Sequence, residues 1–168
     1  RFFDLFPELK AQSQQAYHHL SLLDLLSFRT RLLAYTYTHA EPTREQFTGD
    51  DAAQRLQFVT WFLRHEPVPQ KKGVQFSNVG YVAAGLMLEK VSGKPYTTLV
   101  RELGDELGID FGFGAPNATD SLQPWGHDAQ LMPEPPGDAY KLNWLLPAGN
   151  INASLPQYVR FIQEQLQG

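Results

Sequence analysis

The chain has 168 residues, of which 42% are hydrophobic and 12% aromatic, so it carries enough apolar surface to fold and we exclude wholesale disorder. Its net charge of -4 argues against nucleic acid as a partner, and no apolar run approaches the ~18 residues of a membrane span. The absence of cysteine excludes disulfides, thiolate metal sites and a cysteine nucleophile but leaves the compartment open.

The length fits one core, and we expect residues 1–168 to form a single helical domain or subdomain. The sequence opens on Arg1 without an initiator Met or a signal segment. We therefore expect the chain to be an excised part of a larger protein.

Helical periodicity is the recurrent signal in the first half of the chain. Ser21 and Asp24 resemble a capping box ahead of four leucines, which predicts a short helix ending near Phe28. Apolar residues then recur at helical spacing over residues 50–64, with two aspartates at the positive end of the helix dipole. The sequence thus predicts a second helix there.

The most apolar predicted helix begins at Ser77 and Asn78, either of which can cap it, and ends at Val91 before the left-handed stop Ser92-Gly93. Its first three turns are apolar nearly all round, and such a helix is normally buried on several sides. Because a chain this small can hardly provide that cover, we expect the helix to lie against material outside the chain.

Two more helices are predicted toward the C-terminus. Residues 96–107 carry one apolar face that Gly104 weakens. Ser154 and Gln157 form a capping box for a helix that ends near Gln167. We expect this last helix to bury its apolar positions, which are Leu155, Val159, Ile162 and Leu166.

The stretch between these helices, residues 109–146, is rich in glycine and proline, which prevent any long regular element. Strand signals are weak throughout, so the predicted fold class is mainly α with one long irregular loop. Loops of this length are usually binding surfaces, lids or disordered linkers. The aromatic residues Trp125, Tyr140 and Trp144 argue against simple disorder.

The residues that could carry chemistry form few recognisable patterns. None of the five histidines has the i, i+4 partner of a zinc-binding helix, so neither a metal nor a cofactor is predicted. His127 and Asp128 could be a base with its orienting carboxylate, but a turn held by side-chain hydrogen bonds is the simpler interpretation. No glycine-rich phosphate loop is present, so the sequence does not support a nucleotide site.

One stretch of the sequence gives a more specific signal than these isolated residues. Residues 75–81 read Gln-Phe-Ser-Asn-Val-Gly-Tyr, and residues 85–94 read Gly-Leu-Met-Leu-Glu-Lys-Val-Ser-Gly-Lys. This run resembles the serine β-lactamase and penicillin-binding-protein superfamily, in the class C β-lactamase-like branch that also contains DD-peptidases and esterases. In that branch a Tyr-x-Asn motif opens a helix that continues as Gly-Leu-x-x-Glu-Lys-x-x-Gly-Lys.

Two further segments resemble the same branch in the same order. Residues 3–10 and then 22–27 look like the family's passage into its Leu-Leu-x-His-x-Ser-Gly segment. Residues 147–149, Pro-Ala-Gly, followed by Ser154, look like its Pro-Ala-Gly-Gly-x-x-Ser-Thr helix start. Phe28 and Arg31 depart from this pattern, because the family often has His and Gly at these two positions.

The resemblance implies that the chain is the helical subdomain of the β-lactamase/transpeptidase-like fold, in a serine hydrolase that transfers the acyl group of an amide, ester or β-lactam. Such enzymes use a Ser-x-x-Lys nucleophile and a Lys/His-Thr-Gly strand. No serine here has Lys three residues later, and the strand would lie beyond Gly168. We therefore expect the chain alone to be inactive, with the rest of the hydrolase domain as its packing partner and an acyl substrate in the parent. The resemblance also suggests export to the periplasm or cell surface.

The candidate catalytic residues are Phe76, Ser77 and Asn78, in the place of Tyr-x-Asn. Asn78 keeps the amide that contacts substrate and the nucleophile's lysine in the family, although it is also a candidate helix cap. Phe76 has no proton to transfer, which removes a general acid/base contribution of about 10²- to 10⁴-fold. Ser77 offers a hydroxyl one residue out of register.

Four loop residues are candidates for the substrate-binding wall, together with Asn78: Trp125, His127, Tyr140 and Trp144. They could equally anchor the loop to its own core. Because Phe76 and Phe28 depart from the family pattern, we keep a second hypothesis open. The parent would then be a non-catalytic relative that binds a peptide, a cell-wall ligand or a protein.

Overall fold

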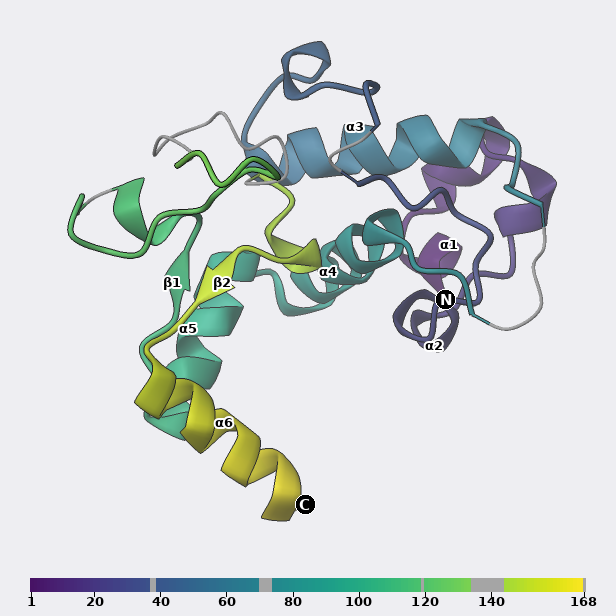
Figure 1. The fold of residues 1–168 in the computed structure, drawn as a ribbon. Coiled ribbons are helices and arrows are strands. Elements are labelled where there is room, and N and C mark those ends of the chain that lie inside the picture. The colour runs from purple at the N-terminus through teal and green to yellow at the C-terminus, as the bar shows by residue number, and fades with distance from the viewer. Residues whose placement is uncertain (37–38, 70–73, 119, 134–143, 168) are drawn as a thin grey trace. The chain divides into compact units, whose positions relative to one another are not determined.

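The computed structural model describes residues 1–36, 39–69, 74–118, 120–133 and 144–167 (Figure 1). It divides into two compact units, Arg1–Tyr96 and Thr97–Gly168, which we describe separately. The mainly α prediction is confirmed, because the strands of the described residues form one two-stranded sheet. The elements are α1 (Phe2–Leu5), α2 (Leu22–Leu26), α3 (Asp51–Arg64), α4 (Asn78–Ser92), α5 (Tyr96–Leu107), β1 (Gly112–Phe113), β2 (Ile151–Asn152) and α6 (Leu155–Gln167), with short 3-10 turns between them.

The predicted capping box of α2 is present with both of its hydrogen bonds. Ser21 Oγ accepts from the Asp24 backbone N–H at 3.1 Å, and the Asp24 carboxylate accepts from the Ser21 N–H at 3.0 Å. Hydrogen bonds from Ser21 also hold the pKa of Asp24 below its usual value. The helix ends at Leu26, before Phe28, because Phe28 adopts a left-handed conformation with φ 58°.

The ends of α3 and α4 agree with their sequence signals. The Asp50 carboxylate caps α3 by accepting from the Ala53 N–H at 2.8 Å. Ser77, the residue before the first helical position, caps α4 by accepting from the Gly80 N–H at 3.2 Å. Gly93 ends α4 with φ 70°, the left-handed stop that the sequence predicts.

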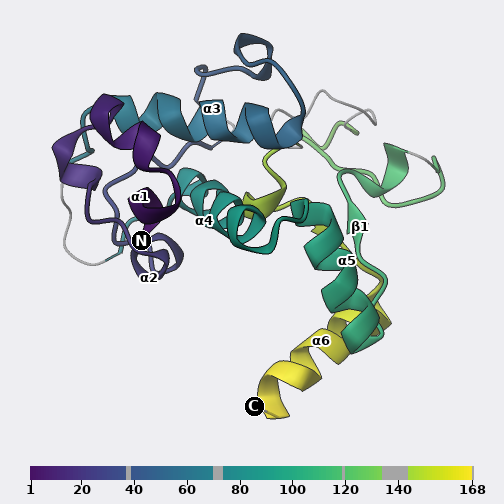
Figure 2. The ribbon, with the colours of Figure 1, turned by 180° about the vertical axis from the view of Figure 1, so that it is seen from behind.

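Helix α4 forms the centre of the first unit, where it packs against α1, α2 and α3 (Figure 2). Apart from the half-buried Tyr81, its residues are buried from Asn78 to Met87. The expectation that material outside the chain covers this helix is therefore wrong for its first three turns. The neighbours α1, α2 and α3 cover these turns because glycine and alanine let them approach closely: a Cβ at Gly80 would lie 3.3 Å from the Leu25 carbonyl oxygen of α2. Only the last turns expose apolar side chains, at Leu88 and Val91.

A buried ion pair joins α3 to α4. One guanidinium nitrogen of Arg55 lies 2.6 Å from Glu89 Oε1, and the two side chains are 4% and 10% exposed. The same carboxylate oxygen accepts from the Tyr96 backbone N–H at 2.8 Å, where α5 begins. Glu89 therefore fixes both the packing of α4 on α3 and the turn that follows α4.

The second unit contains β1, β2, α6 and most of α5. The strands are antiparallel, with Gly112 opposite Asn152 and Phe113 opposite Ile151. Chain reversal after α5 depends on Gly104, whose carbonyl accepts from the Ile109 N–H at 2.8 Å. A Cβ at Gly104 would lie 2.4 Å from the Ile109 carbonyl oxygen. The chain can therefore reverse direction here only because residue 104 has no side chain, although glycine weakens the helix pattern.

Replacing Gly104 by alanine is expected to destabilise the second unit by about 1–3 kcal/mol, because the new methyl group would overlap a backbone oxygen. In a solvent-exposed helix the same change would stabilise the fold by up to about 1 kcal/mol, so the sign of the change in unfolding free energy tests the packing at Gly104. Urea unfolding and hydrogen exchange of the Ile109 amide measure it. The exposed neighbour provides the control: Asp105→Ala should cause no loss of stability.

The burial predicted for α6 is wrong. The helix forms over the predicted residues, and the Gln157 side chain accepts from the Ser154 N–H at 3.2 Å. Its apolar positions are nevertheless exposed, with Leu155 at 74%, Val159 at 46%, Ile162 at 38% and Leu166 at 82%. Local capping is enough to define the helix, whereas burial needs a partner surface that no described residue supplies.

The central stretch is irregular, as predicted. In residues 109–118, 120–133 and 144–148 the structure has β1 and two short 3-10 turns, Pro116–Ala118 and Leu146–Ala148. Residues 134–143, which include Tyr140, lie outside the described residues. In the described part of the chain, no helix has both the length and the apolar composition needed to cross a bilayer.

Candidate active site

The start of α4 is held by the segment that follows α2. Three consecutive backbone carbonyls of this segment accept one hydrogen bond each: Leu33 from Ser77 Oγ at 2.7 Å, Ala34 from the Asn78 N–H at 2.9 Å and Tyr35 from Asn78 Nδ2 at 2.6 Å. The arrangement brings the predicted residues Ser77 and Asn78 together and fixes both side chains against the backbone.

The Ser77 hydroxyl acts as both donor and acceptor in the contacts at the start of α4. It donates to the Leu33 carbonyl and accepts from the Gly80 N–H, and the residue is 1% exposed. Ser77 is therefore the helix cap, while Asn78 occupies the first position of the helix. The side chain of Asn78 is free of the capping role that the sequence left open for it.

Asn78 is 8% exposed, and its amide has a defined orientation. The atom that faces the Tyr35 carbonyl must be the NH₂ group, because a carbonyl oxygen only accepts hydrogen bonds. Among the described residues, no group donates a hydrogen bond to the other amide atom, Oδ1. Asn78 can therefore offer an acceptor to a ligand or to an ammonium group.

Phe76 directly precedes Ser77, the cap of α4, and is 51% exposed. Its ring centroid is 5.3 Å from that of Phe28, which in turn lies 5.2 Å from Tyr81 of α4. Phe28, Phe76 and Tyr81 thus form an aromatic cluster near the start of α4. The Phe76 ring supplies apolar contact area and no exchangeable proton.

The segment after α2 contains three non-glycine residues with left-handed backbone: Phe28 (φ 58°), Arg31 (φ 59°) and Tyr35 (φ 46°). Such conformations are uncommon and persist only where the surroundings hold them. At Arg31 they are held by two hydrogen bonds to Val68, from Arg31 Nε to the carbonyl and from the Val68 N–H to the Arg31 carbonyl, both 3.0 Å.

The loop candidates Trp125, His127 and Trp144 belong to the second unit. Trp125 is 38% exposed and donates to the Ser121 carbonyl at 2.9 Å, while Trp144 is buried. His127 is exposed, and its neighbour Asp128 accepts from the N–H groups of Gln130 and Met132, both at 2.9 Å. The side chain of Asp128 thus holds a turn, as the simpler interpretation proposes. Among the residues that the structure describes, no three His, Asp or Glu side chains are grouped so as to hold a metal ion.

Tyr35 is the residue that sequence reasoning missed. It is fully buried, and its carbonyl is the acceptor for Asn78. No motif or periodicity distinguishes it, because its contribution comes from backbone direction rather than from side-chain type.

Comparison with known proteins gives a consistent picture. The β-lactamase family model matches residues 7–168. No curated protein matches the sequence. Among solved structures, a class C β-lactamase mutant in which phenylalanine replaces a tyrosine is 18% identical, with 96% of this chain covering 41% of that chain at a TM-score of 0.68.

Two further structures share the fold at similar distance. D-amino acid amidase from Ochrobactrum anthropi SV3, complexed with L-phenylalanine, is 20% identical, with 99% of this chain covering 46% of that chain at a TM-score of 0.64. β-Lactamase/D-alanine carboxypeptidase from Pseudomonas syringae is 12% identical, with coverage of 96% and 46% and a TM-score of 0.58. The chain thus spans less than half the length of each of these proteins. Identities this low show the fold alone, whereas the family model covers nearly the whole sequence, and the chain therefore belongs to the β-lactamase family.

Proposed function

We propose that this chain is the mainly helical subdomain of a larger serine hydrolase that transfers the acyl group of an amide, an ester or a β-lactam. The observation that carries the proposal is the hydrogen-bonded start of α4, where Asn78 stands in the place of the family's motif asparagine with its Oδ1 left to accept. Family membership and a length below half that of related structures support it.

The nucleophile and the far wall of the pocket come, in this proposal, from the rest of the parent domain. The sequence has no serine followed three residues later by lysine, and no Lys/His-Thr-Gly strand. The exposed apolar positions of α6 and of the last turns of α4 support a packing partner outside the chain. The chain alone is then inactive.

We propose Asn78 as a substrate contact in the parent and treat the loop of the second unit separately. Trp125, His127 and Tyr140 are the proposed wall residues, because aromatic side chains with polar tips suit a peptide, an acyl ester or a β-lactam ring. Trp144 is 4% exposed, so we propose it as an anchor of the loop instead. The substrate class is accordingly a small molecule or a peptide with an acyl group.

Inactivity of the chain alone is tested by incubating it with a penicillin and with an activated ester, and then weighing it intact. We expect an unchanged mass, because no serine has the lysine that would activate it. A stable adduct on any serine contradicts the proposal. The longer parent provides the positive arm and should form an adduct on the serine of its Ser-x-x-Lys motif.

The second candidate function is a non-catalytic binding module for a peptide, a cell-wall ligand or a protein. Phe76 favours it, since a half-exposed phenyl ring at the motif position binds apolar groups but transfers no proton. The two functions differ in what a restored hydroxyl group at residue 76 would do to ester hydrolysis by the parent.

A further inference from the structure

The orientation of the Asn78 amide decides what the start of α4 offers to a ligand. With Nδ2 directed at the Tyr35 carbonyl, the side chain presents its oxygen; rotated by half a turn, it would present its NH₂ group and place two oxygens face to face. The contact with Tyr35 therefore selects one of two chemically different surfaces.

The Tyr35 carbonyl faces Asn78 because the residue adopts φ 46°, a conformation that costs about 1–2 kcal/mol for a residue with a Cβ. The surroundings hold it there. The ring is fully buried and makes edge contacts with Phe58 and Phe62 of α3, at centroid distances of 4.9 and 5.5 Å.

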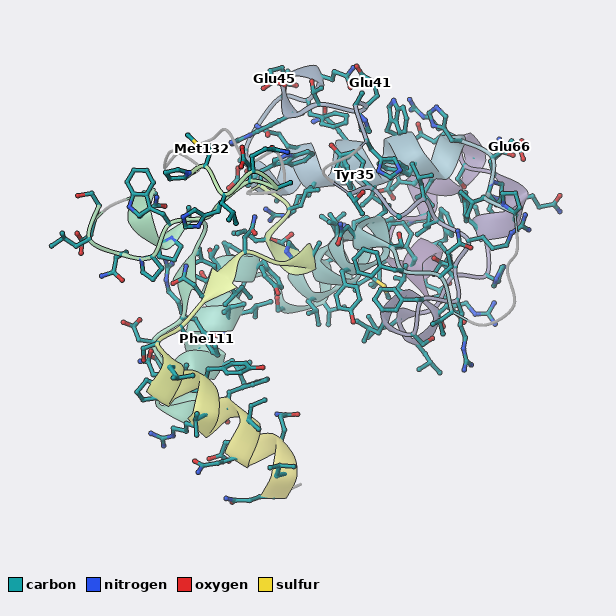
Figure 3. The ribbon with its side chains drawn as sticks, in the orientation of Figure 1. Tyr35, Glu41, Glu45, Glu66, Phe111 and Met132 are labelled. Atoms are coloured by element: carbon teal, nitrogen blue, oxygen red, sulfur yellow. The ribbon has the colours of Figure 1, made fainter. Side chains whose placement is uncertain are left out.

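The hydroxyl group of Tyr35 provides a second anchor, since it donates to the Pro42 carbonyl at 2.5 Å. Burial raises the pKa of this hydroxyl, and the carboxylates of Glu41 and Glu45 add to the effect, so the group stays protonated and donates at neutral pH (Figure 3). Ring and hydroxyl together fix the direction in which the backbone carbonyl points.

We propose that Tyr35 is a positioning residue: its left-handed backbone, held by the buried ring and the bond to Pro42, locks the Asn78 amide with Nδ2 inward and Oδ1 toward the site. The role of Asn78 in a site rests on the proposed function, whereas the lock itself does not. The locked amide offers Oδ1 as an acceptor to an ammonium or N–H group. The Nδ2 proton that is bonded to the Tyr35 carbonyl is not available to a carbonyl oxygen of a ligand.

Nuclear magnetic resonance of the 168-residue chain, with side-chain amides labelled with ¹⁵N and tyrosine carbonyls labelled with ¹³C, tests the lock. We expect a through-hydrogen-bond coupling between Asn78 Nδ2 and the Tyr35 carbonyl carbon. We also expect one Nδ2 proton to exchange with solvent about tenfold or more slowly than the amide protons of the exposed Gln15. Asn78→Asp assigns the signal by removing it.

The variants separate positioning from simple packing. Tyr35→Phe keeps the ring and removes the bond to Pro42, and it should speed exchange of the protected Asn78 proton by about tenfold, the factor that one lost hydrogen bond represents. Tyr17→Phe is the matched control, because Tyr17 is also buried in the first unit but is not a partner of Asn78. It should leave the Asn78 signal unchanged.

Three results would overturn the inference: no coupling and no protection in the unmodified chain, an unchanged Asn78 signal in Tyr35→Phe, or equal changes in both tyrosine variants. If Tyr35→Phe does not fold, the coupling in the unmodified chain decides alone. Its presence supports the inference, and its absence contradicts it. None of these readouts involves catalysis. A locked amide in a parent that hydrolyses no ester would reject the proposed function and leave the lock standing.

Discussion

Replacing Glu89 by glutamine is expected to destabilise the first unit by about 3–5 kcal/mol, the usual result of removing one partner from a buried ion pair. The Arg55 guanidinium is 4% exposed, so without a carboxylate its charge would stay buried and uncompensated. Glutamine keeps the size of the side chain and an acceptor for the Tyr96 N–H, so the loss reports charge rather than shape. Urea unfolding followed by circular dichroism measures it.

An exposed pair of the same unit is the control. Arg44 and Asp51 lie 3.3 Å apart, with side chains 38% and 57% exposed, and Asp51→Asn should cost less than about 1 kcal/mol. The double replacement Arg55→Met with Glu89→Leu should recover much of the loss, because it leaves no buried charge. If Glu89→Gln unfolds at the same urea concentration as the unmodified chain, the ion pair is not the link between α3 and α4 that we describe.

Restoring the motif hydroxyl, Phe76→Tyr, is expected to raise ester hydrolysis by the longer parent by about 10²- to 10⁴-fold, the usual contribution of a general acid or base. The ring at this position is 51% exposed, so an added hydroxyl group meets water rather than a packed core. It would stand two residues from Asn78, where the family has its tyrosine. The measurement is kcat/KM with an activated ester.

Val74→Tyr controls for a phenol placed near the site without the motif register, since Val74 is 65% exposed and two residues upstream. It should give no comparable gain. Rapid hydrolysis with Phe76 in place would remove the reason for the binding-module hypothesis. Binding without hydrolysis in both proteins would support that hypothesis and contradict the enzyme.

The candidate site could be predicted in part. The resemblance makes Phe76, Ser77 and Asn78 candidates, and their role stays a prediction. The structure brings the side chains of Ser77 and Asn78 against one backbone segment. Which of the two polar residues caps α4 could not be predicted, since serine and asparagine are both good caps. Tyr35 could not be found either, because the direction of its carbonyl depends on α3 and on Pro42 rather than on neighbours in the sequence.

What the sequence determined by itself was the course of the helices. The ends of α3, α4, α5 and α6 follow from caps, glycine stops and apolar spacing. These signals act over three or four residues, so they can be recognised in the local sequence. The tertiary structure decided which apolar faces are covered. The first three turns of the apolar helix α4 are enclosed by its own chain, whereas the apolar positions of the amphipathic α6 are exposed. Burial depends on which distant segments approach each helix, and the residue pattern of a helix carries no information about that.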